Sequence, residues 1–208
     1  MDDTLLAPPV PHAGGVRTLA RALTALGWGA GVWGVLYAIN GATQAPAAVR
    51  VPVTLLAAPG APATGAVTAA FTVPDGWLDG SGSRLTLRLW GSSVPEQVLS
   101  RGDVLLGGLA LLVLALAVGP VLRSIAAGDP FAVGNPRRLM VAAGAIVVGG
   151  AVAPFLPQIA AAQVIARAGL SAHLAPVHTF PLAPLVTAAL VLVLVPVFRA
   201  GTALTRSF

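Results

Sequence analysis

LRSIAAGDPFAVGNPRRL, residues 122–139, separates two long apolar runs of the chain. Gly128 predicts the end of the preceding helix, because glycine readily takes the left-handed conformation, and Pro130 blocks any continuation. Asn135 and Pro136 predict the start of the next helix, since asparagine caps free backbone N–H groups and proline suits the first helical position. The stretch therefore predicts a structured turn between two membrane helices.

Three arginines, Arg123, Arg137 and Arg138, flank this turn. Because arginines near the ends of membrane spans favour the cytoplasmic side, we expect the loop, residues 124–138, to be cytoplasmic. Arg137 and Arg138 lie at the start of a helix, where the helix dipole disfavours positive charge. We therefore expect a compensating anion: Asp129, a lipid phosphate or an acidic patch on a partner. The simpler alternative is that the loop only turns the chain and fixes its topology.

The other loop residues favour a rigid surface that faces a partner. Asp129 is expected to accept backbone N–H bonds within the turn. Phe131 is expected to tuck between the second and third membrane helices or to lie in the headgroup layer, and Pro130 and Pro136 restrict the loop. The candidate partner- or lipid-binding residues are Arg123, Gly128, Asp129, Pro130, Phe131, Asn135, Arg137, Arg138 and Arg199.

Two motifs in the chain carry a family resemblance. GDPF at residues 128–131, followed by Asn135 and by RRL at residues 137–139, resembles the G-x-P-F…N…R-L-R signature of the DUF2975 family of small bacterial membrane proteins of unknown function. VFRAG, residues 197–201, resembles the V-F-R-x-G ending of that family, although Pro196 stands where the family often has an acidic residue. Family members are often encoded beside small helix-turn-helix regulators, so the resemblance implies a soluble regulator of this kind as a partner.

The composition is that of an integral membrane protein. The chain is 56% hydrophobic and only 9% charged, with a mean hydropathy of +0.87, whereas soluble domains carry about 25% charged residues. The absence of cysteine excludes disulfides and thiolate metal sites. All 12 basic residues are arginine, which is typical of a GC-rich bacterial genome. They lie mostly at span ends, so the charge of +5 does not indicate direct nucleic-acid binding.

The apolar runs predict a membrane α-helical fold: a four-transmembrane-helix bundle with a small extracytoplasmic antiparallel β domain between helices 1 and 2. A cleaved signal peptide is the alternative for the first helix, because residues 42–48 are rich in small side chains. The expected order is a disordered cytoplasmic tail (1–16), helix 1 (17–40), the β-rich domain (41–101), helix 2 (102–123), the cytoplasmic loop (124–138), helix 3 (139–160), an outer segment (161–180), helix 4 (181–199) and a cytoplasmic tail (200–208).

The distribution of arginines predicts the orientation. With both termini inside, seven arginines lie in inner segments and five in outer segments, and four of these five belong to the outer domain, where charge has little effect on topology. We therefore expect a multi-pass protein of the bacterial cytoplasmic (inner) membrane with cytoplasmic N- and C-termini.

The β domain is predicted from three runs: residues 49–55, 66–73 and 84–90, the last alternating between leucine on one face and polar side chains on the other. Asp75 and Asp79 are expected in solvated turns. A domain of this size is marginal alone, so we expect it to lean on the membrane surface or on a second copy. Pro154 and Pro157 are expected to bend or break helix 3.

The four runs lack ionisable side chains in their interiors, which argues against pumps, ion-coupled transporters and intramembrane proteases. His173 and His178 have no nearby carboxylate or cysteine, so we expect interfacial histidines and no metal. We therefore expect no enzyme activity and no cofactor. One hypothesis is a sensing or regulatory protein with a cytoplasmic partner. The other is a structural or accessory subunit of a larger membrane complex, such as a transporter. It would associate through an apolar outer sheet and through the small-residue pairs Gly27–Gly31 and Ala145–Gly149.

Overall fold

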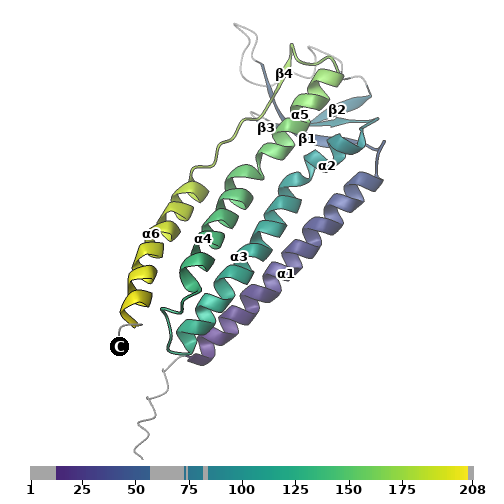
Figure 1. The fold of residues 1–208 in the computed structure, drawn as a ribbon. Helices are drawn as coiled ribbons and strands as arrows, with labels where there is room; N and C mark the ends of the chain where they lie inside the picture. Colours follow the sequence, from purple (N-terminus) through teal and green to yellow (C-terminus); the bar gives the residue numbers. More distant parts are fainter. Residues whose placement is uncertain (1–12, 57–72, 74, 82–83, 206–208) are drawn as a thin grey trace, which may run out of the picture.

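The computed structural model describes residues 13–56, 73, 75–81 and 84–205, which form a mostly helical protein with one small sheet (Figure 1). In chain order the elements are α1 (Ala13–Thr43), β1 (Val49–Leu55), β2 (Gly76–Ser81), β3 (Arg84–Leu89), α2 (Val94–Ser100), α3 (Gly102–Ala126), α4 (Asn135–Val147), a π-helical turn (Val148–Val152), α5 (Phe155–Arg167), β4 (Leu174–Pro176) and α6 (Ala183–Thr205).

Four helices within the described residues are long and apolar enough to cross a membrane: α1, α3, the continuous run Asn135–Arg167, and α6. They indicate a multi-pass membrane protein. They lie side by side in the order α1, α3, α4, α6 (Figure 1), so the four predicted helices form a single row. Large apolar side chains such as Leu26, Trp33 and Leu190 are therefore exposed on the row, where lipid can cover them.

The ends of the first and last helices differ from the prediction. Helix α1 begins at Ala13, inside the tail predicted for residues 1–16, and α6 continues to Thr205, inside the tail predicted for residues 200–208. Residues 1–12 and 206–208 lie outside the described part of the chain.

Small residues hold the helix row together from within. A Cβ atom added at Gly27 would overlap Ala115 of α3, one at Gly31 would press on Leu112, and one at Gly149 would overlap Ala110. These glycines therefore let neighbouring backbones approach closely. The prediction that they form interfaces with another subunit is wrong, because α3 already occupies them.

The third long helix was predicted to end near residue 160. It continues instead to Arg167. The amide N–H of Ala153 donates to the carbonyl of Val148 at 2.9 Å, which is the hydrogen bond of a π-helical turn. Pro154 follows this turn and Pro157 lies in the first turn of α5, where proline needs no intrahelical N–H partner. The predicted bend or break is therefore confirmed: the α-helix is interrupted from Val148 to Pro154 and restarts at Phe155.

The sheet is antiparallel with the strand order β2-β3-β1-β4. The predicted alternation in β3 is confirmed, since Leu87 and Leu89 are buried. Asp79 lies within β2 and pairs with Arg88 at 2.7 Å, so the turn predicted at this position is wrong. The cross-strand position next to a cationic side chain outweighs the turn preference of Asp-Gly. The strand predicted for residues 66–73 lies outside the described residues except for Val73, which is not in a strand.

Helix α5 covers the buried face of the sheet, in place of the membrane surface or second copy expected from the sequence. Val51 of β1 and Leu87 of β3 form one core with Ala160 and Val164 of α5 and with Leu174 of β4, all at most 2% exposed. Both α5 and β4 come from the segment 161–180 and the residues just before it, so the β domain is not confined to residues 41–101. Its core depends on the far end of the third span.

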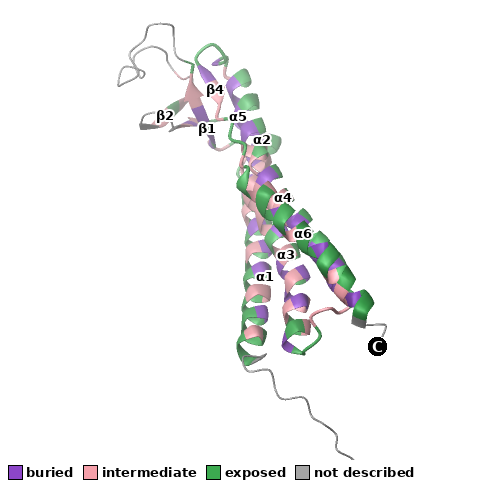
Figure 2. Ribbon diagram, turned by 90° about the vertical axis from the view of Figure 1, so that its left-hand side faces the viewer, coloured by how far each residue is buried: buried purple, intermediate pink, exposed green. Residues whose placement is uncertain are grey.

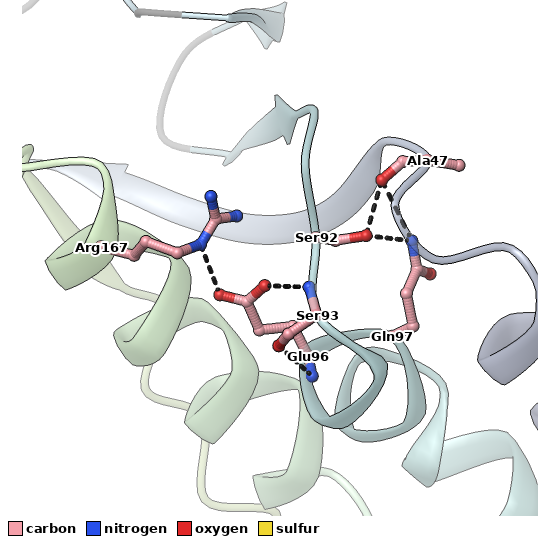
Figure 3. Close-up of polar contacts among 6 residues, drawn as sticks. All are labelled: Ala47, Ser92, Ser93, Glu96, Gln97 and Arg167. Atoms are coloured by element: carbon pink, nitrogen blue, oxygen red, sulfur yellow. Dashed lines mark hydrogen bonds and ion pairs between the residues drawn. The ribbon is translucent and has the colours of Figure 1, made fainter.

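Helix α2 connects the sheet region to α5 (Figure 3). Ser93 and Glu96 form a capping box at its start, and Glu96 also accepts a hydrogen bond from Arg167 Nε at 2.8 Å. Burial raises the pKa of the Glu96 carboxyl, but the hydrogen bonds from Arg167 and the Ser93 backbone lower it more, so the pKa lies below its ordinary value of 4.5. The carboxylate therefore stabilises the joint between α2 and α5.

Candidate functional site: the loop between α3 and α4

Gly128 ends α3 as predicted. Its φ is 81°, and its amide donates to the carbonyl of Ile125 at 3.0 Å, while the amide of Asp129 donates to Ser124 at 2.9 Å. These two bonds form a Schellman motif, which satisfies the last carbonyls of a helix. The Asp129 carboxylate is exposed and accepts no hydrogen bond from any described residue, so its predicted role as an acceptor in the turn is wrong. Its backbone, not its side chain, serves the turn.

Asn135 is the buried centre of the loop, with a relative exposure of 0%. Its Nδ2 donates to Ser124 Oγ at 2.8 Å and to the carbonyl of Pro130 at 2.9 Å, and its Oδ1 accepts from Arg138 Nη1 at 3.1 Å. Gly134, not Asn135, precedes the helix, and no side chain caps α4. The predicted capping role is therefore wrong, because the Asn135 side chain is used to join α3, the loop and α4.

Phe131 packs on α6, so the predicted position between the second and third membrane helices is wrong, while the alternative position in the headgroup layer stays a prediction. Its ring meets Phe198 edge to face at a centroid distance of 5.7 Å, and a Cβ atom at Gly201 would overlap it. The Thr202 hydroxyl lies 2.9 Å from the carbonyl of Phe131. The two sequence motifs, GDPF and VFRAG, thus meet in space. An edge-to-face aromatic pair at this distance adds to the burial of the two rings.

The arginines of the loop have different surroundings. Arg138 is half-buried and donates to Asn135 Oδ1. Arg123 is exposed and donates to the carbonyl of Gly119 at 3.3 Å. Arg137 is exposed and has no polar partner among the described residues. Neither Arg137 nor Arg138 pairs with Asp129, so the prediction of this residue as their anion is wrong. A lipid phosphate or a partner's acidic group stays a prediction.

Two grooves meet at Arg137. A groove of about 330 Å³ between α4 and α6 also has Met140 and Arg199 in its wall, and the Arg199 guanidinium lies 3.8 Å from the Met140 sulfur. A second groove, of about 270 Å³, opens between α3 and α4, where Figure 2 shows α4 and α6 leaning away from α3 and α1 towards the loop end. The structure thus brings Arg137 and Arg199 to one surface, while Arg123 lies on α3 outside both grooves.

Sequence reasoning missed Ser124 and Thr202, which bond to the loop from α3 and α6. A serine in the last turn of a predicted span and a threonine just after VFRAG are the signals that could have indicated them. It also missed the polar cluster at the sheet end, where Gln97 Nε2 donates to Ser92 Oγ at 2.7 Å (Figure 3). Within the described residues, no three His, Asp or Glu side chains lie close enough to hold a metal ion.

Comparison with known proteins gives no match to a family model, a curated protein or a solved structure.

Proposed function

We propose that this protein is a non-enzymatic sensing or regulatory protein of the bacterial cytoplasmic membrane, which binds a signal at the sheet end and acts on a soluble partner through the loop 124–138. One observation carries the proposal: the run Asn135–Arg167 is a continuous helical element of 33 residues. Its first residue is the buried centre of the loop, and Ala160 and Val164 near its other end lie in the core of the sheet.

A change at the sheet end has a direct mechanical route to the loop. Because both ends of the run are buried and closely packed, a small shift of the helix repacks both ends rather than being absorbed by one of them. At the loop end, Asn135 moves together with its bonds to Ser124 and Pro130. The exposed surface of the loop is then displaced as a unit.

The surface offered to a partner consists of exposed charges that form no ion pair with any described residue. Asp129 and Arg137 are exposed and have no ion-pair partner among the described residues, and Arg123 is exposed on the last turn of α3. The resemblance to the DUF2975 family favours a small helix-turn-helix regulator as the partner. The arginine distribution favours a cytoplasmic loop with both termini inside.

Co-purification in mild detergent tests the partner. The wild type should retain a soluble protein that Arg123→Ala combined with Arg137→Ala loses, while the matched control Arg50→Ala, an exposed arginine of the sheet, retains it. Arg138 is left unchanged because it supports Asn135. Equal retention by the loop variant, or no soluble protein retained by the wild type, would contradict the proposal.

Reporter fusions test the orientation. Fusions at residues 75, 130 and 207 should give a periplasmic signal only at residue 75. A periplasmic signal at residue 130 or 207 would exclude a cytoplasmic loop and with it the proposed partner site.

A further inference from the structure

A cavity of about 410 Å³ lies where the sheet meets the start of α3 and of α5. Strand β1 contributes Pro52, β3 contributes Thr86, α3 contributes Asp103, and α5 contributes Gln158 to its wall. This volume is within the range of about 300–1,000 Å³ that is typical of small-ligand sites. The sequence did not indicate it, because its walls come from four separate elements.

Asp103 is the one charged side chain among the described lining residues. Asp103 supplies a carboxylate, whose Oδ1 accepts from the amide of Val104 at 2.8 Å and which pairs with no cation among the described residues. Pro52, Pro154 and Pro157 have no backbone N–H to donate. The described lining residues include no arginine or histidine. The cavity therefore suits an occupant that donates hydrogen bonds and carries positive charge.

Gln158 adds a buried acceptor without a donor. This side chain is 6% exposed, and its Nε2 donates to the carbonyls of Pro154 and Thr179, both at 3.1 Å. Because a carbonyl can only accept, these bonds fix which end of the amide is the oxygen. Oε1 has no hydrogen-bond partner among the described residues. The accessible surface of Oε1 is under 1 Å², so this oxygen is enclosed by protein atoms, and the charged acceptor of the wall is Asp103.

Apolar groups complete the wall, since Leu85 and Val177 lie beside the proline rings. We infer that the cavity binds an amphipathic organic amine, whose ammonium pairs with Asp103 and whose apolar body lies against the prolines, Leu85 and Val177. A protonated primary amine brings one positive charge, which complements the Asp103 carboxylate, and three N–H donors.

The site adjoins the continuous helix at its irregular part. Pro154, Pro157 and Gln158 all belong to the run Asn135–Arg167 and follow the π-helical turn. The inference rests on the proposed function for its consequence, because an occupant here would shift the helix that reaches the loop. Its binding test does not involve the loop, so the two can fail independently.

Calorimetric titration of the full-length protein in phosphatidylcholine nanodiscs tests the inference, with empty nanodiscs as the blank. The probes are phenethylamine, tryptamine and octylamine, with N-acetyltryptamine as the neutral and indole-3-propionate as the anionic counterpart of tryptamine. At least one amine should bind saturably at one site per chain. If tryptamine binds, N-acetyltryptamine and indole-3-propionate should bind at least about tenfold more weakly than tryptamine. If only phenethylamine or octylamine binds, N-acetyltryptamine and indole-3-propionate should show no binding.

Two variants change the site without removing a structural bond. Asp103→Asn keeps the Oδ1 that accepts from Val104 but removes the charge, and Thr86→Lys places a cation in the wall. Both should weaken the amine at least about tenfold, whereas the matched control Asp75→Asn, an exposed carboxylate at positive φ, should not. The inference is overturned if none of the three amines binds the wild type, if both site variants bind as the wild type does, or if the control loses binding equally.

Discussion

Asn135 offers the sharpest test of the loop as a rigid structure. Replacing Asn135 by leucine keeps a similar volume but removes three hydrogen bonds, to Ser124, Pro130 and Arg138. The first two join neutral groups and contribute about 1 kcal/mol each. The bond from Arg138 is charge-assisted but half-exposed, so solvent screening reduces it to about 1 kcal/mol. We expect the loop to be less stable towards local opening by about 3 kcal/mol.

Hydrogen exchange measures this opening at named amides. The amides of Gly128 and Asp129 are protected by bonds to Ile125 and Ser124. Because each 1.4 kcal/mol is a factor of 10, these amides should exchange about 100-fold faster in Asn135→Leu. Ser124→Ala removes one of the three bonds and should give about a 5-fold increase.

Asp129→Asn is the matched control for Asn135→Leu. Asp129→Asn changes an exposed side chain without a partner among the described residues, so exchange in residues 124–138 should stay within about 2-fold of the wild type. If Asn135→Leu also leaves these amides unchanged, the three bonds do not hold the loop. It is then only a turn.

Three further variants probe the rest of the chain by thermal unfolding in detergent. Glu96→Gln should flatten the dependence of stability on pH. Because the folded-state pKa of Glu96 is lowered, its contribution to stability is present above about pH 4.5 and is lost as the pH falls through that lowered value. Equal acid sensitivity of the wild type and the variant would contradict this. Phe131→Ala should lower the free energy of unfolding by about 2 kcal/mol, because the contacts of the half-buried ring with Phe198 and Gly201 are lost. The control Val133→Ala, at an exposed position, should lower it by less than about 0.5 kcal/mol. Similar losses in the two variants would count against the packing of Phe131 on α6. Gly27→Leu should lower the free energy of unfolding by about 1–3 kcal/mol, because the added side chain forces α1 away from α3. The control Gly29→Leu should be tolerated, because a Cβ atom at Gly29 meets open space. Equal stability of the two variants would contradict the packing of α1 on α3.

Features set by neighbouring residues were predictable from the sequence. Gly128 ends α3 because the left-handed conformation is a local preference of glycine, and Pro136 lies in the first turn of α4 for an equally local reason. The alternation of Leu85, Leu87 and Leu89 predicted β3 because side chains of a strand alternate between faces. The four long apolar helices followed from length and composition.

Features set by distant residues were not predictable in this way. Strand β4 has three residues and forms only by pairing with β1, so no periodicity could indicate it. Phe131 could be expected to avoid water, but its contact with Gly201 depends on α6 returning beside α4. Asn135 has the local preference of a cap, and burial beneath the loop turns its side chain to Ser124 and Pro130 instead. Tertiary contacts decided each of these positions.

The π-helical turn explains how one helix can serve both ends of the molecule. Its second and third residues are glycines: a Cβ atom at Gly149 would overlap Ala110 of α3, and one at Gly150 would overlap Pro184 at the start of α6. The third span is therefore held on both sides by close packing at this one level, while its ends extend to the sheet and to the loop. In the proposed function, an amine bound beside Pro154 lies just beyond this level and would act on the loop through α4.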